Sequence, residues 1–136
     1  MVDEATKQRI IAMAEELAVN GELACADAHR IAAQLGISAL EVSRVINRAT
    51  QLRFFRCQLG LFGYGPKAEG KSKIVRPAER IPEEIDEALS ERVRENHISC
   101  ADLWELADRF KYPRLQMGNI AEAKGLRVRP CQLGCF

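Results

Sequence analysis

Apolar positions along the chain recur at helical spacing in several separate stretches. In the first of these stretches, residues 4–19, Ile10, Ala14 and Leu17 fall on one face, which predicts an amphipathic helix. Asn20 and the glycine after it are typical of a helix end. The sequence therefore opens with a helix that buries one side.

Four further elements are predicted before the first glycine-rich segment. A short extended piece at residues 23–25 precedes a helix over residues 26–35, which Gly36 ends. A third helix is expected over residues 38–51, because its first residue is a serine with a glutamate three positions later, the pattern of a capping box. The aromatic stretch 52–57 favours a strand.

The chain repeats itself at an offset of about 75 residues. The tetrapeptide Cys-Gln-Leu-Gly occurs at 57–60 and again at 131–134, and Cys-Ala-Asp occurs at 25–27 and at 100–102. Apolar positions between these markers also match at the same offset. We therefore interpret the chain as a tandem duplication.

The duplication divides the chain into a first unit at 1–63, a basic glycine-rich wing or linker at 64–76 and a second unit at 77–136. Residues 73–75 are expected to return as the antiparallel partner of the strand at 52–57, with the glycine loop as the tip. In the second unit Gly118 weakens the third helix, and the chain leaves no room for a second wing.

The stretch 31–45 resembles the helix-turn-helix of DNA-binding proteins. Ala32 is small where two helices cross, Gly36 suits the tight turn, and five apolar residues form the seam between the helices. The strands and the glycine loop that follow are similar to the winged-helix version. This resemblance implies a mainly α fold with short β-strands, made of two tandem winged-helix-like units. The second unit is degenerate, since Lys111 replaces the turn glycine.

Charge is segregated along a chain of 136 residues whose net charge is only +1. Successive segments 1–43, 44–76, 77–108 and 109–136 carry net charges of −4, +7, −7 and +5. In both units the charge becomes positive at the third helix, the element that a winged helix presents to DNA. A basic face of this kind binds the phosphate backbone even when the whole protein is nearly neutral.

Helical spacing assigns the candidate DNA contacts. If Val42 and Val45 face the core, the third helix turns a set of polar residues outward, among which Arg44 suits guanine and Asn47 suits adenine. Basic residues on the strand and wing are assigned to phosphates. The predicted DNA-binding residues are Ser38, Ser43, Arg44, Asn47, Arg48, Arg53, Arg56, Lys67, Lys71 and Lys73.

Four cysteines occupy equivalent places in the two units: Cys25, Cys57, Cys100 and Cys131. Three interpretations stay open. They are buried structural thiols, or ligands of zinc or an iron–sulfur cluster shared by the two units, or a thiol redox sensor. The sequence has no Cys-x-x-Cys pair, and buried thiols without a cofactor are the favoured interpretation.

The sequence lacks the motifs of common enzymes: no nucleophile elbow, no phosphate loop and no Ser/His/Asp set. No apolar run is long enough to cross a membrane, and the chain does not start like a signal peptide, so we expect a cytoplasmic protein. We predict a small transcriptional regulator that binds double-stranded DNA, as a homodimer or with a protein partner. The alternative is a protein-interaction or accessory module of two packed repeats.

Overall fold

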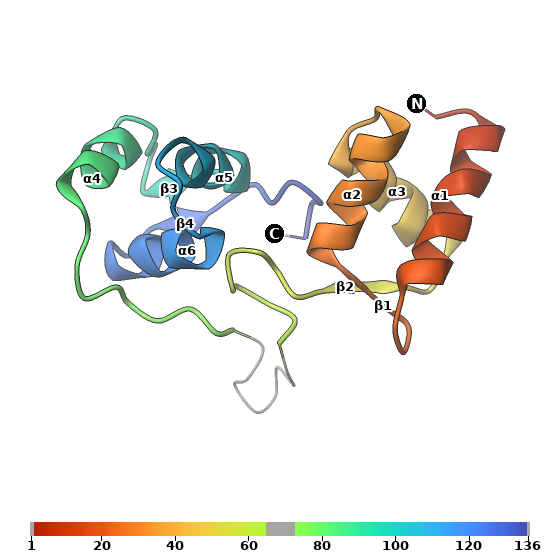
Figure 1. The fold of residues 1–136 in the computed structure, drawn as a ribbon, viewed down its shortest axis with the longest axis horizontal. Helices are drawn as coiled ribbons and strands as arrows, with labels where there is room; N and C mark the ends of the chain where they lie inside the picture. Colours follow the sequence, from red (N-terminus) through yellow and green to blue (C-terminus); the bar gives the residue numbers. More distant parts are fainter. Residues whose placement is uncertain (1, 65–72, 136) are drawn as a thin grey trace.

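The computed structural model describes residues 2–64 and 73–135, so the predicted wing residues Lys67 and Lys71 lie outside the described residues. The described part is mainly helical, with short strands, and the same order of elements occurs twice (Figure 1). No helix within it is long and apolar enough to cross a membrane. Positions 75 residues apart in the helices, and 74 apart in the Cys-Gln-Leu-Gly segments, are called equivalent below.

The first repeat has the predicted helices and short strands. Asp3 caps the first helix by accepting a hydrogen bond from the Thr6 amide at 2.8 Å. Ser38 caps the third helix as predicted, through the Glu41 amide at 3.1 Å. Gly36 takes the left-handed conformation, with φ of 67°, that the tight turn requires. The elements are α1 Glu4–Leu17, β1 Glu22–Ala24, α2 Cys25–Leu35, α3 Ala39–Ala49 and β2 Arg53–Phe55.

The second repeat copies this order with shorter elements. Ser99 caps its middle helix by accepting a hydrogen bond from the Asp102 amide at 3.0 Å. Lys111 adopts the left-handed conformation of its equivalent Gly36, with φ of 52°, so the turn is kept without the glycine. The elements are α4 Glu83–Ser90, β3 His97–Ile98, α5 Cys100–Arg109, α6 Arg114–Ala123 and β4 Arg127–Val128.

The predicted antiparallel wing is wrong in the described residues. β2 pairs with β1, and the pairing is parallel, with Leu23 opposite Phe54. Residues 73–75 form no strand. The amides of Ile74 and Val75 instead donate to the carbonyl oxygen of Gly60, at 2.8 and 3.2 Å. The returning chain therefore leaves the first repeat and lies against the second.

Each repeat contributes a short segment to the hydrophobic core of the other repeat. Leu59, from the first repeat, is fully buried in the core built by α4, α5 and α6. Leu133, at the equivalent position, is buried in the core built by α1, α2 and α3. In Figure 1 the C-terminal segment runs from the second repeat to α2 and α3, and the segment after β2 runs toward α6. Residues 57–60 and 131–134 are called the exchanged segments below.

Each exchanged segment is held at an equivalent helix position. The hydroxyl of Ser43, in α3, donates to the carbonyl oxygen of Leu133 at 2.5 Å. Gly118, the equivalent position in α6, lies so close to the carbonyl oxygen of Leu59 that a Cβ atom on it would be 2.1 Å away. The first repeat thus holds its exchanged segment with a hydrogen bond, and the second repeat contacts its exchanged segment by a close approach of the two backbones.

His29 and Trp104 are also equivalent and meet each other between the repeats. Their ring centroids are 4.3 Å apart, and the Arg114 guanidinium stacks over Trp104 at 3.8 Å from the ring centre. Trp104 packs against both cores. Burial and the charge of Arg114 lower the pKa of His29 to about 4, so its ring is neutral at neutral pH.

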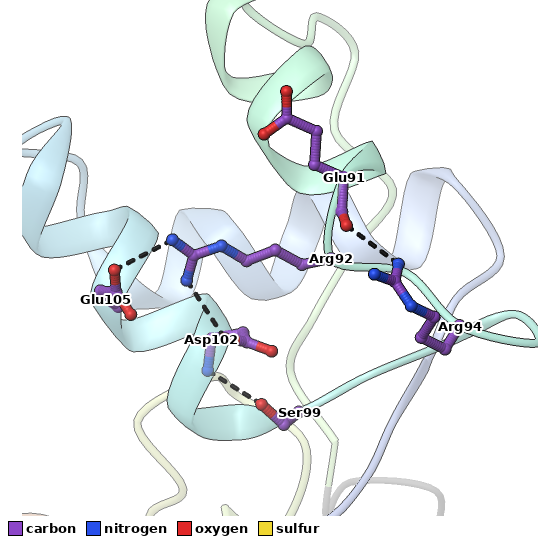
Figure 2. A network of polar contacts seen from close by, with 6 residues as sticks. All are labelled: Glu91, Arg92, Arg94, Ser99, Asp102 and Glu105. Carbon is purple, nitrogen blue, oxygen red and sulfur yellow. Dashed lines mark hydrogen bonds and ion pairs between the residues drawn. The ribbon is translucent and has the colours of Figure 1, made fainter.

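A cluster of ion pairs attaches α4 to α5 in the second repeat (Figure 2). The guanidinium of Arg92, which follows α4, reaches Asp102 at 3.1 Å and Glu105 at 2.9 Å. Both carboxylates lie on α5. Arg94 turns back to donate to the carbonyl oxygen of Glu91 at 2.9 Å. These contacts hold the short α4 where the longer α1 lies in the first repeat.

Candidate nucleic-acid interface

Three polar side chains form an exposed face on α3: Arg44, Asn47 and Arg48. Val42, Val45 and Ile46 are buried on the other side of the same helix, so its amphipathic pattern turns these three outward. This residue set is called the α3 face below. It agrees with the spacing argument from the sequence for these three residues.

Ser43 is a correction to the predicted set, since the prediction that it faces outward is wrong. Its side chain is buried, with 1% of the residue exposed, because the exchanged segment covers it. The hydroxyl donates to Leu133 and also accepts a hydrogen bond from the Asn47 amide nitrogen at 3.3 Å. Ser43 therefore has no free group for a base, but it links the exchanged segment to the α3 face.

Both positively and negatively charged side chains lie beside the α3 face. A surface hollow of about 380 Å³ lies between α1 and α3, lined by residues that include Lys7, Arg44 and Arg48. Glu4 and Glu41 line the same hollow. Three cations and two carboxylates leave a small excess of positive charge in this hollow.

Those remaining predicted DNA contacts that the structure describes do not form one group. Ser38 is exposed but serves as the cap of α3. Arg53 is exposed on β2, and Arg56 stacks over the Phe55 ring at 5.0 Å from its centre. Lys73 forms an ion pair with Glu122 of α6 at 2.9 Å. Lys73 is thus attached to the second repeat rather than placed beside α3.

The equivalent face of α6 is covered by the chain itself, which sequence reasoning missed. The side chain of Asn119 accepts a hydrogen bond from the Arg76 amide at 2.9 Å, and its backbone oxygen accepts one from the Ala78 amide at 3.1 Å. Asn119 is equivalent to Arg44, and Glu122, which binds Lys73, is equivalent to Asn47. The second repeat therefore does not expose a helix face equivalent to the α3 face of the first repeat.

All four equivalent cysteines are buried and unpaired, as free thiols. Cys25 and Cys131 lie in the first core, and Cys57 and Cys100 in the second, so each core holds one thiol from each repeat. Among the described residues no group of three or more Cys, His, Asp or Glu side chains is arranged to hold a metal ion. This placement fits the interpretation as buried structural thiols.

Cys131 and Cys135 form a thiol pair that sequence reasoning did not single out. A hydrogen bond from the Cys135 thiol lowers the pKa of Cys131, and backbone N–H groups of residues 133–135 act in the same direction. The Leu133 amide lies 3.4 Å from the Cys131 sulfur. The same contact and burial raise the pKa of Cys135. The only sequence signal was their spacing of four residues.

The buried thiols predict a loss of stability at alkaline pH. Burial raises the pKa of Cys25 to about 12 and that of Cys100 to about 11, from an ordinary 9.0. Because the folded-state pKa is raised, the stability that each neutral thiol contributes is full below pH 9 and is lost as the pH rises through the folded-state value. Each thiol then costs about 1 kcal/mol per pH unit above 9.

Urea unfolding between pH 8 and pH 10 measures this effect. The variant Cys25→Ala is expected to lose about 1 kcal/mol less than the wild type over that interval, because one titrating group is gone. The exposed-site variant Val19→Ala serves as the control and should follow the wild-type profile. Parallel pH profiles for wild type and Cys25→Ala would contradict the assignment.

No protein-family model, no curated protein and no solved structure matches this chain. The class of the protein therefore rests on the arrangement of the repeats and on the α3 face.

Proposed function

We propose that the protein is a DNA-binding protein of the helix-turn-helix class, with α2 and α3 as the two helices of the motif. The single observation that supports this most is the α3 face. It carries two arginines and an asparagine, side chains that recognise guanine and adenine edges in the major groove, on the second helix after a tight turn.

In this proposal α3 enters the major groove of double-stranded DNA. Arg44 donates two hydrogen bonds to a guanine, and Asn47, oriented by the Ser43 hydroxyl, pairs with an adenine. Arg48 and Arg53 contact phosphates. The second repeat acts as a support, since its exchanged segment holds Ser43 from behind. A role as a small transcriptional regulator follows from this mode of binding.

Binding to fluorescently labelled random duplex DNA across a salt series tests the proposal. The double variant Arg44→Ala/Arg48→Ala is expected to bind at least about tenfold more weakly at low salt. The slope of log affinity against log salt should fall by about 1, because Arg48 is the one of the two that neutralises a phosphate. Anisotropy of the labelled DNA gives both quantities.

A matched control removes the same charge elsewhere. Arg9, on the outer side of α1, and Arg80 are both exposed. The double variant Arg9→Ala/Arg80→Ala should keep nearly the wild-type affinity. Equal losses in the two double variants, or a wild type that fails to bind at low salt, would overturn the proposal.

A further inference from the structure

The second exchanged segment ends in a turn that brings two thiols together. The Gly134 amide donates to the Cys131 carbonyl oxygen at 3.0 Å, and Gly134 takes the left-handed conformation with φ of 75°. The Leu133 amide lies 3.4 Å from the Cys131 sulfur. The Cys135 thiol donates a hydrogen bond to the same sulfur. The turn therefore holds the sulfur atoms of Cys131 and Cys135 in hydrogen-bond contact.

The equivalent turn in the first repeat provides an internal comparison. The Gly60 amide donates to the Cys57 carbonyl oxygen at 2.9 Å, and backbone N–H groups of the turn donate to the Cys57 sulfur. Leu61 stands there in the place of Cys135. Burial raises the pKa of Cys57, whereas the hydrogen bond from Cys135 lowers the pKa of Cys131. Both copies thus share the backbone of the turn, and only the second copy has the second thiol.

Both thiols of this pair are accessible to a small oxidant. Cys135 is exposed. Cys131 is 8% exposed and lines a surface groove of about 490 Å³ at the start of α3, together with Gly134. Burial raises the pKa of both Cys25 and Cys100, so these two thiols hold little of the reactive thiolate at neutral pH. The pair is therefore the place in the described chain where oxidation is favoured.

We propose that Cys131 and Cys135 form a thiol–disulfide site that reacts with hydroperoxides, with Cys131 as the attacking thiolate and Cys135 as the thiol that resolves the intermediate. The site requires a residue that the first repeat lacks, so it is not a property of the four equivalent cysteines. It is also independent of the DNA-binding proposal.

The reaction balances over two steps. The Cys131 thiolate attacks one oxygen of hydrogen peroxide, the O–O bond breaks, and the released hydroxide takes up a proton and leaves as water. The Cys135 sulfur then attacks the Cys131 sulfenic acid, which forms the S–S bond and releases a second water. Two thiols are thereby oxidised by two electrons to a disulfide, and the peroxide is reduced to water.

The contact between the two sulfurs also sets the order of these steps. The hydrogen bond to Cys131 raises the pKa of Cys135, and burial acts in the same direction. Cys135 therefore keeps its proton while Cys131 is a thiolate. Oxidation of Cys131 removes that thiolate, so Cys135 loses its proton more easily and becomes the second nucleophile.

Mass spectrometry of the whole chain tests the proposal, with the protein first reduced and then treated with hydrogen peroxide at neutral pH. The wild type is expected to lose the mass of two hydrogen atoms, and proteolysis should place the disulfide between Cys131 and Cys135. The variant Cys135→Ala should stop at the Cys131 sulfenic acid, which dimedone traps as an adduct.

The pH dependence of the reaction distinguishes a thiolate from a merely structural cysteine. In the wild type the rate of Cys131 oxidation should rise with pH until Cys131 is deprotonated and then level off. In Cys135→Ala the midpoint of this profile should lie at least about one pH unit higher, because the hydrogen bond that stabilises the thiolate is lost.

Cys57→Ala is the matched control, because it removes a buried thiol from the equivalent turn. This variant should form the disulfide between Cys131 and Cys135 at the wild-type rate. Circular dichroism before and after peroxide treatment checks that each protein stays folded.

Four results would overturn the proposal. They are no reaction with excess peroxide, a disulfide that joins Cys131 or Cys135 to another cysteine of the chain, a covalent dimer through Cys135, and equal midpoints for the wild type and Cys135→Ala. Failure of the DNA experiment leaves these results unaffected, since the peroxide assay contains no DNA.

Discussion

The variant Leu133→Ala is expected to lose about 3 kcal/mol of the free energy of unfolding, although Leu133 is only two residues from the last described residue. Its side chain is 1% exposed and lies in the core of the other repeat. Truncating a buried leucine removes its transfer free energy and leaves a cavity, which together cost about 2–5 kcal/mol. Urea unfolding followed by circular dichroism measures the change.

Leu40→Ala is the matched control for this prediction. The same atoms are removed at an exposed position beside the same exchanged segment, so the expected cost is below about 1 kcal/mol. Leu59→Ala should behave like Leu133→Ala, because its equivalent side chain is fully buried in the second core. A cost for Leu133→Ala no larger than that for Leu40→Ala would show that the segment is not packed there.

Gly118→Ala is expected to destabilise the protein by about 2–3 kcal/mol, against the usual direction for glycine in a helix. Helix propensity alone predicts a gain of about 1 kcal/mol from this change. However, a Cβ atom at this position would stand 2.1 Å from the Leu59 carbonyl oxygen and 3.0 Å from its carbonyl carbon. Backbone atoms cannot rotate away as a flexible side chain does, so the exchanged segment must shift.

Gln116 provides the reference for the sign of this stability change. It is exposed in the same helix, so replacing Gln116 first by alanine and then by glycine measures helix propensity without a packing term. Alanine should be the more stable of the two at position 116 and the less stable at position 118. Thermal unfolding of the three variants and the wild type gives the comparison, and a stabilised Gly118→Ala would refute the close contact with Leu59.

Local features of the fold could be predicted from the sequence because they depend on neighbouring residues. The Ser38 cap, the left-handed Gly36 and the buried side of α3 follow from chemistry within a few positions. The exchange of segments could not be predicted in this way. The repeats offer chemically similar surfaces to the Cys-Gln-Leu-Gly segments, and sequence equivalence alone does not say which copy a segment packs on.

The errors at the candidate site share this long-range origin. Ser43 lies beside Val42 at the edge of the apolar stripe, and a contact 90 residues away decides that it is buried. Residues 73–75 have the composition of a strand, yet their amides find the Gly60 carbonyl oxygen instead of β2. The exposure of Arg44, Asn47 and Arg48 needed only helical spacing, and was predicted for that reason.

The exchange of core segments within one chain also removes a dependence on mass action. If two separate chains each contributed a core leucine to the other, they would dissociate on dilution, and their stability would vary with protein concentration. Here the two repeats are covalently joined, so each exchanged segment meets its binding site at a high effective concentration. The two joined copies, moreover, need not have the same sequence. One helix keeps Arg44 exposed while its equivalent in the other copy, Asn119, holds the connecting chain, a division of labour that two identical subunits cannot have.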